Sequence, residues 1–299
     1  MDSVIFDPTF DDQERRQQLF RGQLIVYSAT KFSRELIELA QSLAREAFGR
    51  LDPRTAQDSM PVRQYADLLA ELKPRFIHHP EAKRILRALL EEIGCDPAAT
   101  YFDVPRLRTS TSNGYLTTGI AYAFHPHRDT WYSAPMCQVN WWIPVYEIES
   151  GNAMAFHPAY WGRPLRNGSR DYNYHEWNRV SRFQAAQQVG VDTRQQPMPE
   201  ESVELDPQVR VITPPGGVLA FSAAHLHSSV PNFTGTTRLS IDFRTVHLDD
   251  VANRVGAPNY DSECTGTTMG DYLRVSDLDH IPTDLASRYE SGTELVKSG

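Results

Sequence analysis

The sequence has few of the features that mark several common protein classes. It contains only three cysteines, Cys95, Cys137 and Cys264, whose wide spacing excludes a disulfide framework or a CxxC zinc motif. It has no block of lysine and arginine, and its formal net charge is −8, which argues against nucleic acid as a partner. No apolar run approaches the roughly 20 residues of a membrane helix, and the first residues lack a basic-then-apolar signal pattern. We therefore expect a cytoplasmic protein without nucleic-acid or membrane partners.

The residues that are present predict a folded chain whose first third is mainly helical. With 40% hydrophobic residues over 299 positions, the chain can bury a substantial core, and we expect one domain over 1–299. A short strand is expected at 24–27. Apolar residues at helical spacing then predict three helices, the first ending at Gly49, the second opening at Pro61 and the third opening at Pro80. These elements make 1–100 a mainly helical part.

The middle of the chain changes to β-branched and aromatic residues punctuated by proline and glycine. Strands are predicted at 102–108, 115–124, 138–145, 153–156, 209–213, 218–222 and 238–246. A run of helices followed by many short strands indicates an α+β fold with a barrel or jelly-roll core over 101–247. A long insert at about 158–205 has little strand signal, and loops of this length are typically functional. A C-terminal extension, 248–299, has no clear pattern.

A candidate metal site combines a His-x-Asp motif with a distant histidine. His127 and Asp129 share a side of an extended backbone, so both can reach one divalent ion. His227, at the end of a predicted strand, is the third candidate ligand. Two histidines and one carboxylate on one face, with open positions opposite, form the ligand set of a non-haem Fe(II) site. His125 and His225 share the same parity and are the alternatives to His127 and His227.

An arginine and a serine on the next predicted strand complete the pattern. Arg238 and Ser240 share parity and would face the same interior as the metal ligands. An unpaired arginine inside a barrel would be costly, which predicts an anionic ligand for it. A guanidinium holds a carboxylate through two parallel hydrogen bonds, and a hydroxyl can add a third.

Taken together, these motifs resemble the Fe(II)/2-oxoglutarate-dependent dioxygenases, and among them the phytanoyl-CoA dioxygenase-like branch. Two further segments, 149–158 and 227–232, are similar to motifs of that branch, and the resemblance covers about 100–247. It implies a double-stranded β-helix of jelly-roll or cupin-like type, flanked by the N-terminal helices. It also departs from the branch at Ala159-Tyr160-Trp161, where a Pro-Gly-Ser-His segment is usual.

The resemblance also implies roles for individual residues. His127, Asp129 and His227 would bind Fe(II), while Arg238, assisted by Ser240, would pair with the distal carboxylate of 2-oxoglutarate. Molecular oxygen and a small organic molecule would be the other substrates, and hydroxylation the default outcome. A stand-alone enzyme of this kind would suit a tailoring step of secondary metabolism. Because Asp129 occupies the carboxylate position, a related halogenase is disfavoured.

Further site residues follow with alternatives left open. Gln138 and Asn140 alternate on one strand and either bind 2-oxoglutarate or make hydrogen bonds in the core. Trp131 and Tyr132, just after the metal motif, are candidates for a substrate pocket wall, and Trp161 for a lid formed by the insert. The alternative functions are a cupin-like metalloenzyme that needs no keto acid, such as an isomerase, and a non-catalytic barrel. The oligomeric state stays open.

Overall fold

The computed structural model, which describes residues 4–291, contains two β-sheets, helices on both sides of them and several short helical turns. The strands are β1 (Val4–Phe6), β2 (Leu24–Tyr27), β3 (Thr100–Phe102), β4 (Arg106–Ser110), β5 (Val139–Pro144), β6 (Met154–Phe156), β7 (Val209–Arg210), β8 (Val218–Ser222), β9 (His227–Ser229), β10 (Arg238–His247) and β11 (Leu273–Arg274). The α-helices are α1 (Asp12–Phe20), α2 (Lys31–Phe48), α3 (Val62–Ile77), α4 (Pro80–Glu92), α5 (Tyr174–Glu176), α6 (Leu248–Asn253) and α7 (Thr283–Ala286).

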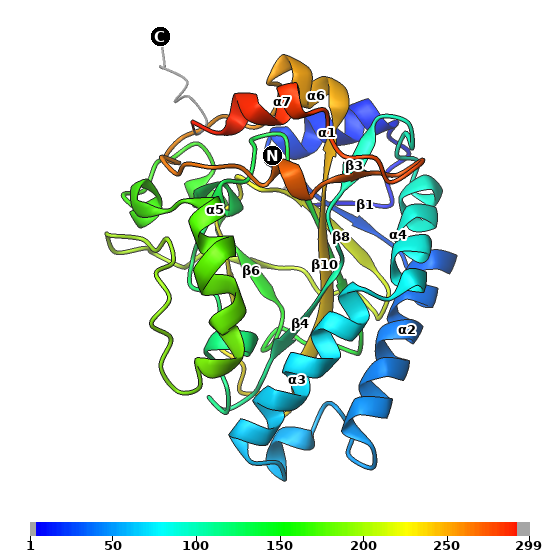
Figure 1. Cartoon of the computed structure of the whole chain (residues 1–299), viewed down its shortest axis with the longest axis vertical. Helices are drawn as coiled ribbons and strands as arrows, with labels where there is room; N and C mark the ends of the chain where they lie inside the picture. Colours follow the sequence, from blue (N-terminus) through cyan, green and yellow to red (C-terminus); the bar gives the residue numbers. More distant parts are fainter. Residues whose placement is uncertain (1–3, 292–299) are drawn as a thin grey trace.

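The larger sheet has eight strands and is antiparallel except for the β1–β2 pair. Its order is β1-β2-β8-β5-β10-β3-β11, with β4 also pairing with β10. A second sheet has three strands in the order β7-β6-β9. Strand β10 runs through the middle of the molecule (Figure 1). It pairs with β5 along one edge and with β4 and β3 along the other. The expectation of an α+β fold is confirmed, since helices accompany a large antiparallel sheet.

The predicted N-terminal helices cover one face of the large sheet. Helix α2 begins with a capping box between Thr30 and Ser33 and ends just before Gly49, whose φ of 62° glycine adopts without strain. Helices α3 and α4 begin immediately after Pro61 and at Pro80, as predicted. Figure 1 shows α2, α3 and α4 along one side of the sheet, with the helical segment containing α5 on the other side.

The alternation of β5 and β10 divides the large sheet into an apolar and a polar face. Val139, Trp141 and Ile143 of β5 join the core beneath the helices, and so do Leu239, Ile241 and Phe243 of β10. The residues between them point to the opposite face. The side chains of Trp141 and Trp142 therefore lie on opposite faces of the sheet, and Trp142 belongs to a smaller apolar cluster with Leu219 and Phe221.

Three predicted strands differ in the structure, and one of them, 209–213, keeps only the two residues of β7. The segment 115–124 forms turns and a short 3-10 helix, η2 (Gly119–Ala121), because Gly114 and Gly119 have positive φ angles that interrupt an extended chain. The segment 102–108 is divided into β3 and β4. Between them the backbone N–H of Asp103 donates to Arg244 O, and Pro105 has no N–H to continue the ladder.

The C-terminal extension packs against the sheet. Met269, Tyr272 and Val275 lie in the same core cluster as the N-terminal helices. The three cysteines are free and buried, as the absence of a disulfide pattern predicted. Among residues 4–291, no helix is long and apolar enough to cross a membrane.

Candidate metal centre and its cavity

His127, Asp129 and His227 converge as the sequence pattern predicts. One nitrogen or oxygen atom from each of the three side chains lies within 4.8 Å of the other two. The Oδ1 atom of Asp129 is 3.5 Å from His127 Nε2 and 3.9 Å from His227 Nε2. Each of these histidines donates its backbone N–H to the carbonyl of the other, at 2.9 and 3.0 Å, so the two chain segments fix the ligands mutually. His125 and His225 take no part in the group.

The protonation of both histidine ligands suits metal binding. His127 donates from Nδ1 to the carbonyl of His125 at 2.7 Å, and His227 donates from Nδ1 to the carbonyl of His225 at 3.0 Å. A carbonyl oxygen only accepts, so Nδ1 of each ring carries a proton, and in the neutral ring the Nε2 lone pair faces Asp129. Burial, reinforced by the neighbouring His127, lowers the pKa of His227 to about 3, which keeps this ring neutral at physiological pH.

Asp129 is held as a carboxylate. Burial alone would raise its pKa, but the close contact with the His127 ring and the positive charge of Arg244 hold that pKa well below the usual value. Arg244 Nε lies 3.8 Å from Asp129 Oδ2, and Gln138 Nε2 donates to the same oxygen at 3.4 Å. Two neutral imidazoles and one carboxylate thus fit a divalent metal that accepts nitrogen and oxygen ligands and leaves positions open for further ligands.

The three ligands face a cavity of about 610 Å³. Residues of both sheets line it, together with helix α3 and the insert. On the large sheet these are the polar-face residues of β10, β5 and β4, including Arg238, Asn140 and Arg108. The small sheet contributes Met154 and the segment 227–229. A cavity of this size accommodates a small organic molecule beside a metal centre.

Arg238 and Ser240 lie in the same cavity, and each has a buried polar atom without a hydrogen-bond partner among the described residues. Arg238 donates from Nη1 to Asn152 O at 2.7 Å, and its guanidinium lies 5.6 Å from the centre of the Trp142 ring. Its Nε and the Oγ of Ser240 are buried with no hydrogen-bond partner among residues 4–291. Burial lowers the pKa of Arg238 to about 10, and the charge of Asp242 opposes this only in part. A buried cation beside a buried free hydroxyl fits a carboxylate ligand.

The amide residues Gln138 and Asn140 line the cavity, but their hydrogen bonds are largely internal. Gln138 donates to Asn140 Oδ1 at 2.7 Å and accepts from the hydroxyl of Tyr272 at 2.7 Å. Through its contact with Asp129, Gln138 connects the metal ligand to the C-terminal extension. This arrangement favours a role in orienting the carboxylate for Gln138 over direct contact with a keto acid.

Of the three residues predicted to contact the substrate, only Tyr132 lines the cavity. Tyr132 lines the cavity, and its ring lies 5.6 Å from that of His127 in an edge-on arrangement. Trp131 does not line it, because the short 3-10 helix η3 (Asp129–Tyr132) turns this side chain into a buried cluster with Tyr160, Leu165 and Leu226. Trp161 also lies outside the cavity wall, with its ring 4.6 Å from the ring of His225.

The insert covers the cavity with a helical segment, residues 174–187, formed by α5, η6 (Trp177–Ser181) and η7 (Arg182–Gln187). It rests on η2, because Thr118 Oγ1 donates to Gln188 O at 2.7 Å and Gly119 N donates to Asp192 Oδ2 at 3.0 Å. Residues of 174–187, and not Trp161, therefore line the cavity on this side.

Gly119 sets how closely the insert approaches. Its φ is 59°, and a Cβ on it would overlap the carbonyl oxygens of Ala185 and Gln188. Gly119→Ala is expected to cost about 1–3 kcal/mol and to lift 174–187 from the cavity. Hydrogen exchange should then quicken in that segment. Gly235→Ala is the matched control, because Gly235 has a φ of 79° with no atom close to a Cβ. Equal exchange in both variants would contradict this role.

Sequence reasoning missed a buried ion pair that braces the metal motif. Arg128, the residue between His127 and Asp129, is 1% exposed and donates from Nε to Asp261 Oδ2 at 3.1 Å. The same carboxylate accepts from Trp131 Nε1 at 2.8 Å and from the backbone N–H of Leu165 at 3.0 Å. Arg128 also donates to Ala224 O, which lies just before the segment of the third ligand. No local motif in the extension signals Asp261.

Comparison with known proteins gives distant structural matches only. No protein-family model and no curated protein matches the chain. One similar solved structure is the non-heme alpha ketoglutarate dependent epimerase SnoN from nogalamycin biosynthesis, with 14% identity over 79% of this chain and 84% of that chain and a TM-score of 0.40. Another is EvdO2 from Micromonospora carbonacea var. aurantiaca complexed with 2-oxoglutarate, with 15% identity over 80% and 92% and a TM-score of 0.45.

A further match is the non-heme alpha ketoglutarate dependent carbocyclase SnoK from nogalamycin biosynthesis, with 11% identity over 85% of this chain and 93% of that chain and a TM-score of 0.38. SnoN has also been solved in complex with Fe3+, alpha ketoglutarate and nogalamycin RO. Identities and scores this low assign no activity to the present chain, so its function has to be inferred from the site.

Proposed function

We propose that the protein is a non-haem Fe(II)- and 2-oxoglutarate-dependent oxygenase that oxidises a small organic substrate, with hydroxylation as the default reaction. The observation that carries the proposal is that one cavity holds both the His-Asp-His group and the unpartnered pair Arg238 and Ser240. The first suits a divalent iron and the second suits the remote carboxylate of a keto acid. When bound, Fe(II) and 2-oxoglutarate supply oxygen-dependent decarboxylation to succinate coupled to oxidation of the substrate.

Each group of residues in the cavity would then have a separate role. His127, Asp129 and His227 hold the metal, and Arg244 and Gln138 keep Asp129 ionised and oriented. Arg238 and Ser240 hold the carboxylate of 2-oxoglutarate. Tyr132 and the segment 174–187 wall the cavity and exclude water from the reacting C–H bond.

We also propose that the two sheets form the double-stranded β-helix of the phytanoyl-CoA dioxygenase-like branch. The placement of the cavity between the large and the small sheet supports this, as does the antiparallel pairing of β9 with β6, in which His227 lies opposite Phe156. A role in secondary-metabolite tailoring and a cytoplasmic location stay predictions from the sequence.

Arg238 provides the most direct test of the co-substrate. Arg238→Met should weaken 2-oxoglutarate binding to the Zn²⁺-loaded protein by about 30-fold or more, because truncating one partner of a buried charge pair costs about 2–5 kcal/mol. Isothermal titration calorimetry measures this affinity. Arg210→Met, which removes an exposed arginine of β7, is the matched control and should leave the affinity unchanged. Equal affinity in wild type and Arg238→Met would refute the assignment.

A cupin-like metalloenzyme that needs no keto acid is the second candidate. The same three ligands favour it, but it gives Arg238 and Ser240 no ligand. Succinate formation that requires Fe(II), oxygen and 2-oxoglutarate would exclude it. Metal-dependent turnover of a substrate without 2-oxoglutarate would instead establish it.

A further inference from the structure

The cavity lining carries positive charge in an otherwise acidic protein. Seven of its lining residues are lysine or arginine and four are aspartate, whereas the whole chain has a formal net charge of −8. A bound Fe(II) and a doubly charged 2-oxoglutarate would cancel each other, so the excess positive charge would remain. A concave site lined by one sign of charge concentrates ligands of the opposite sign.

Most of these cations are neutralised locally, but three are not. Arg108 pairs with Asp242 at 2.6 Å, and Arg194 pairs with Asp192 at 2.6 Å. Arg106 and Arg244 share Asp103. Within residues 4–291, no carboxylate lies in ion-pair distance of Lys73, Arg182 or Arg238. In the proposed function Arg238 binds the carboxylate of 2-oxoglutarate, whereas Lys73 and Arg182 have no anionic partner among the described residues.

Lys73 is placed at an energetic cost that an anion would offset. It projects from α3 into the cavity, and the one hydrogen bond of its ammonium group is to the backbone carbonyl of Ile120. Burial lowers its pKa to about 7, and the nearby charge of Arg108 lowers it further than Asp242 raises it. A half-buried cation beside another cation gains stability when a negative group binds between them.

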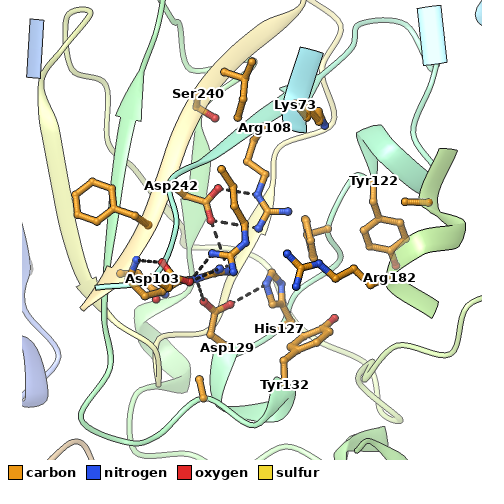
Figure 2. Close-up of a pocket in the computed structure, with 18 of the residues that line it drawn as sticks. Lys73, Asp103, Arg108, Tyr122, His127, Asp129, Tyr132, Arg182, Ser240 and Asp242 are labelled. Atoms are coloured by element: carbon orange, nitrogen blue, oxygen red, sulfur yellow. Dashed lines mark hydrogen bonds and ion pairs between the residues drawn. The ribbon is translucent and has the colours of Figure 1, made fainter. Parts of the chain in front are cut away.

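Arg182 reaches the same space from the opposite wall. It belongs to the insert segment 174–187, and its one side-chain hydrogen bond is to Asn178 Oδ1 at 3.3 Å. Figure 2 shows Arg182 extending from the insert toward His127, with Arg108 and Lys73 on the wall formed by β4 and α3. Apolar and aromatic side chains, including Ile77, Tyr122 and Phe124, line the cavity around these cations.

We propose that Lys73 and Arg182, with Arg108 beside them, form a subsite for an anionic oxygen group of the organic substrate. The inference rests on the proposed function and deepens it by naming the substrate class, a small organic acid whose apolar skeleton lies against Tyr122 and Phe124. The acidic group is a carboxylate or a phosphate. Anchoring this group on α3 and the insert would position the rest of the molecule beside the metal ligands.

Matched probes test the subsite with the co-substrate site filled. Protein saturated with Zn²⁺ and 2-oxoglutarate is titrated with 3-phenylpropionate, phenyl phosphate and the uncharged 3-phenylpropanamide, and binding is followed by ligand-observed NMR. We expect at least one anion to bind at least tenfold more tightly than the amide. The tighter of the two anions identifies the acidic group. Equal binding of the amide and both anions would overturn the proposal.

Substitutions locate the effect. Lys73→Met should weaken binding of the preferred anion at least tenfold and leave binding of the amide unchanged. Lys73→Arg should retain most of the affinity for the anion. Lys31→Met, at the exposed start of α2, is the matched control. Arg182→Met should give a smaller loss, because Arg182 is exposed. Full anion affinity in the Lys73→Met and Arg182→Met double variant would overturn the proposal.

The affinity for 2-oxoglutarate, measured in every variant, separates this proposal from the proposed function. A wild-type protein that binds no 2-oxoglutarate contradicts the proposed function. A protein that binds 2-oxoglutarate but does not prefer anionic probes contradicts only the subsite. Unchanged 2-oxoglutarate affinity in Lys73→Met also shows that the variant is folded.

The pH dependence of anion binding gives a second readout. Lys73 is charged below its pKa of about 7, so affinity for 3-phenylpropionate should fall from about pH 6 to about pH 8.5. The other groups facing it are Arg108, Arg182 and Asp242. Arginine as a residue type does not titrate in this range, and the pKa of Asp242 is lowered despite its burial. Burial raises the pKa of Tyr122, which stays neutral. Lys73→Arg should bind equally at both ends of the range, and a parallel fall in that variant would contradict the role of Lys73.

Discussion

Asp129→Ala is expected to abolish both stoichiometric metal binding and succinate formation. The substitution removes the only anionic ligand of the group and leaves the two imidazoles. A metal centre stabilises the transition state by several kcal/mol, so its loss should decrease turnover by about a thousandfold or more. Metal content by mass spectrometry and succinate release with Fe(II) and 2-oxoglutarate measure the two effects.

Asp129→Ala should remain folded, because Arg244 keeps Asp103 and Asp242 as charge partners. Circular dichroism can verify this. Asp284→Ala, which removes an exposed carboxylate of α7, is the matched control and should behave as wild type. Stoichiometric iron and full turnover in Asp129→Ala would show that the metal, and with it the proposed function, has been assigned to the wrong residues.

Asp261→Ala is expected to have the largest effect on stability. It leaves the guanidinium of Arg128 buried without its charge partner and also removes an acceptor from Trp131. Breaking a buried ion pair in this way costs about 3–5 kcal/mol, which is a large part of the stability of an ordinary domain. Urea unfolding followed by tryptophan fluorescence measures the change.

Two further variants identify the cause. Asp261→Asn keeps a hydrogen-bond acceptor and should lose less stability. The double variant Arg128→Met with Asp261→Leu replaces the pair by apolar groups and should recover much of the loss, because no buried charge remains. If the free energy of unfolding of Asp261→Ala lies within about 0.5 kcal/mol of the wild-type value, the ion pair does not stabilise the protein.

The elements that could be predicted from the sequence are those specified by local pattern. The N-terminal helices have apolar residues at helical spacing and clear start and stop residues, and β8 and β10 have strand-forming residues next to turn signals. The convergence of His127, Asp129 and His227 also follows from local rules, because side-chain parity places each ligand on the inner side of its segment.

The features that could not be predicted depend on tertiary packing. Residues 115–124 alternate like a strand, but glycines with positive φ bend them into turns around the cavity. Trp131 follows the metal motif directly, yet a short 3-10 helix turns it away from the cavity. Lys73 reads as one polar position of an amphipathic helix, and only its position over the cavity indicates a function. Asp261 is brought to Arg128 by the path of the extension.

The two faces of β10 limit how this protein could be altered, by selection or by design. Its apolar residues fill the core beneath the helices and its polar residues line the cavity, so a single inserted or deleted residue would exchange the two sets. The strand is also paired along both edges, which leaves it no room to slip. New substrates are therefore most accessible through changes in α3 and in 174–187, which supply Lys73 and Arg182 and lie outside the sheet ladder.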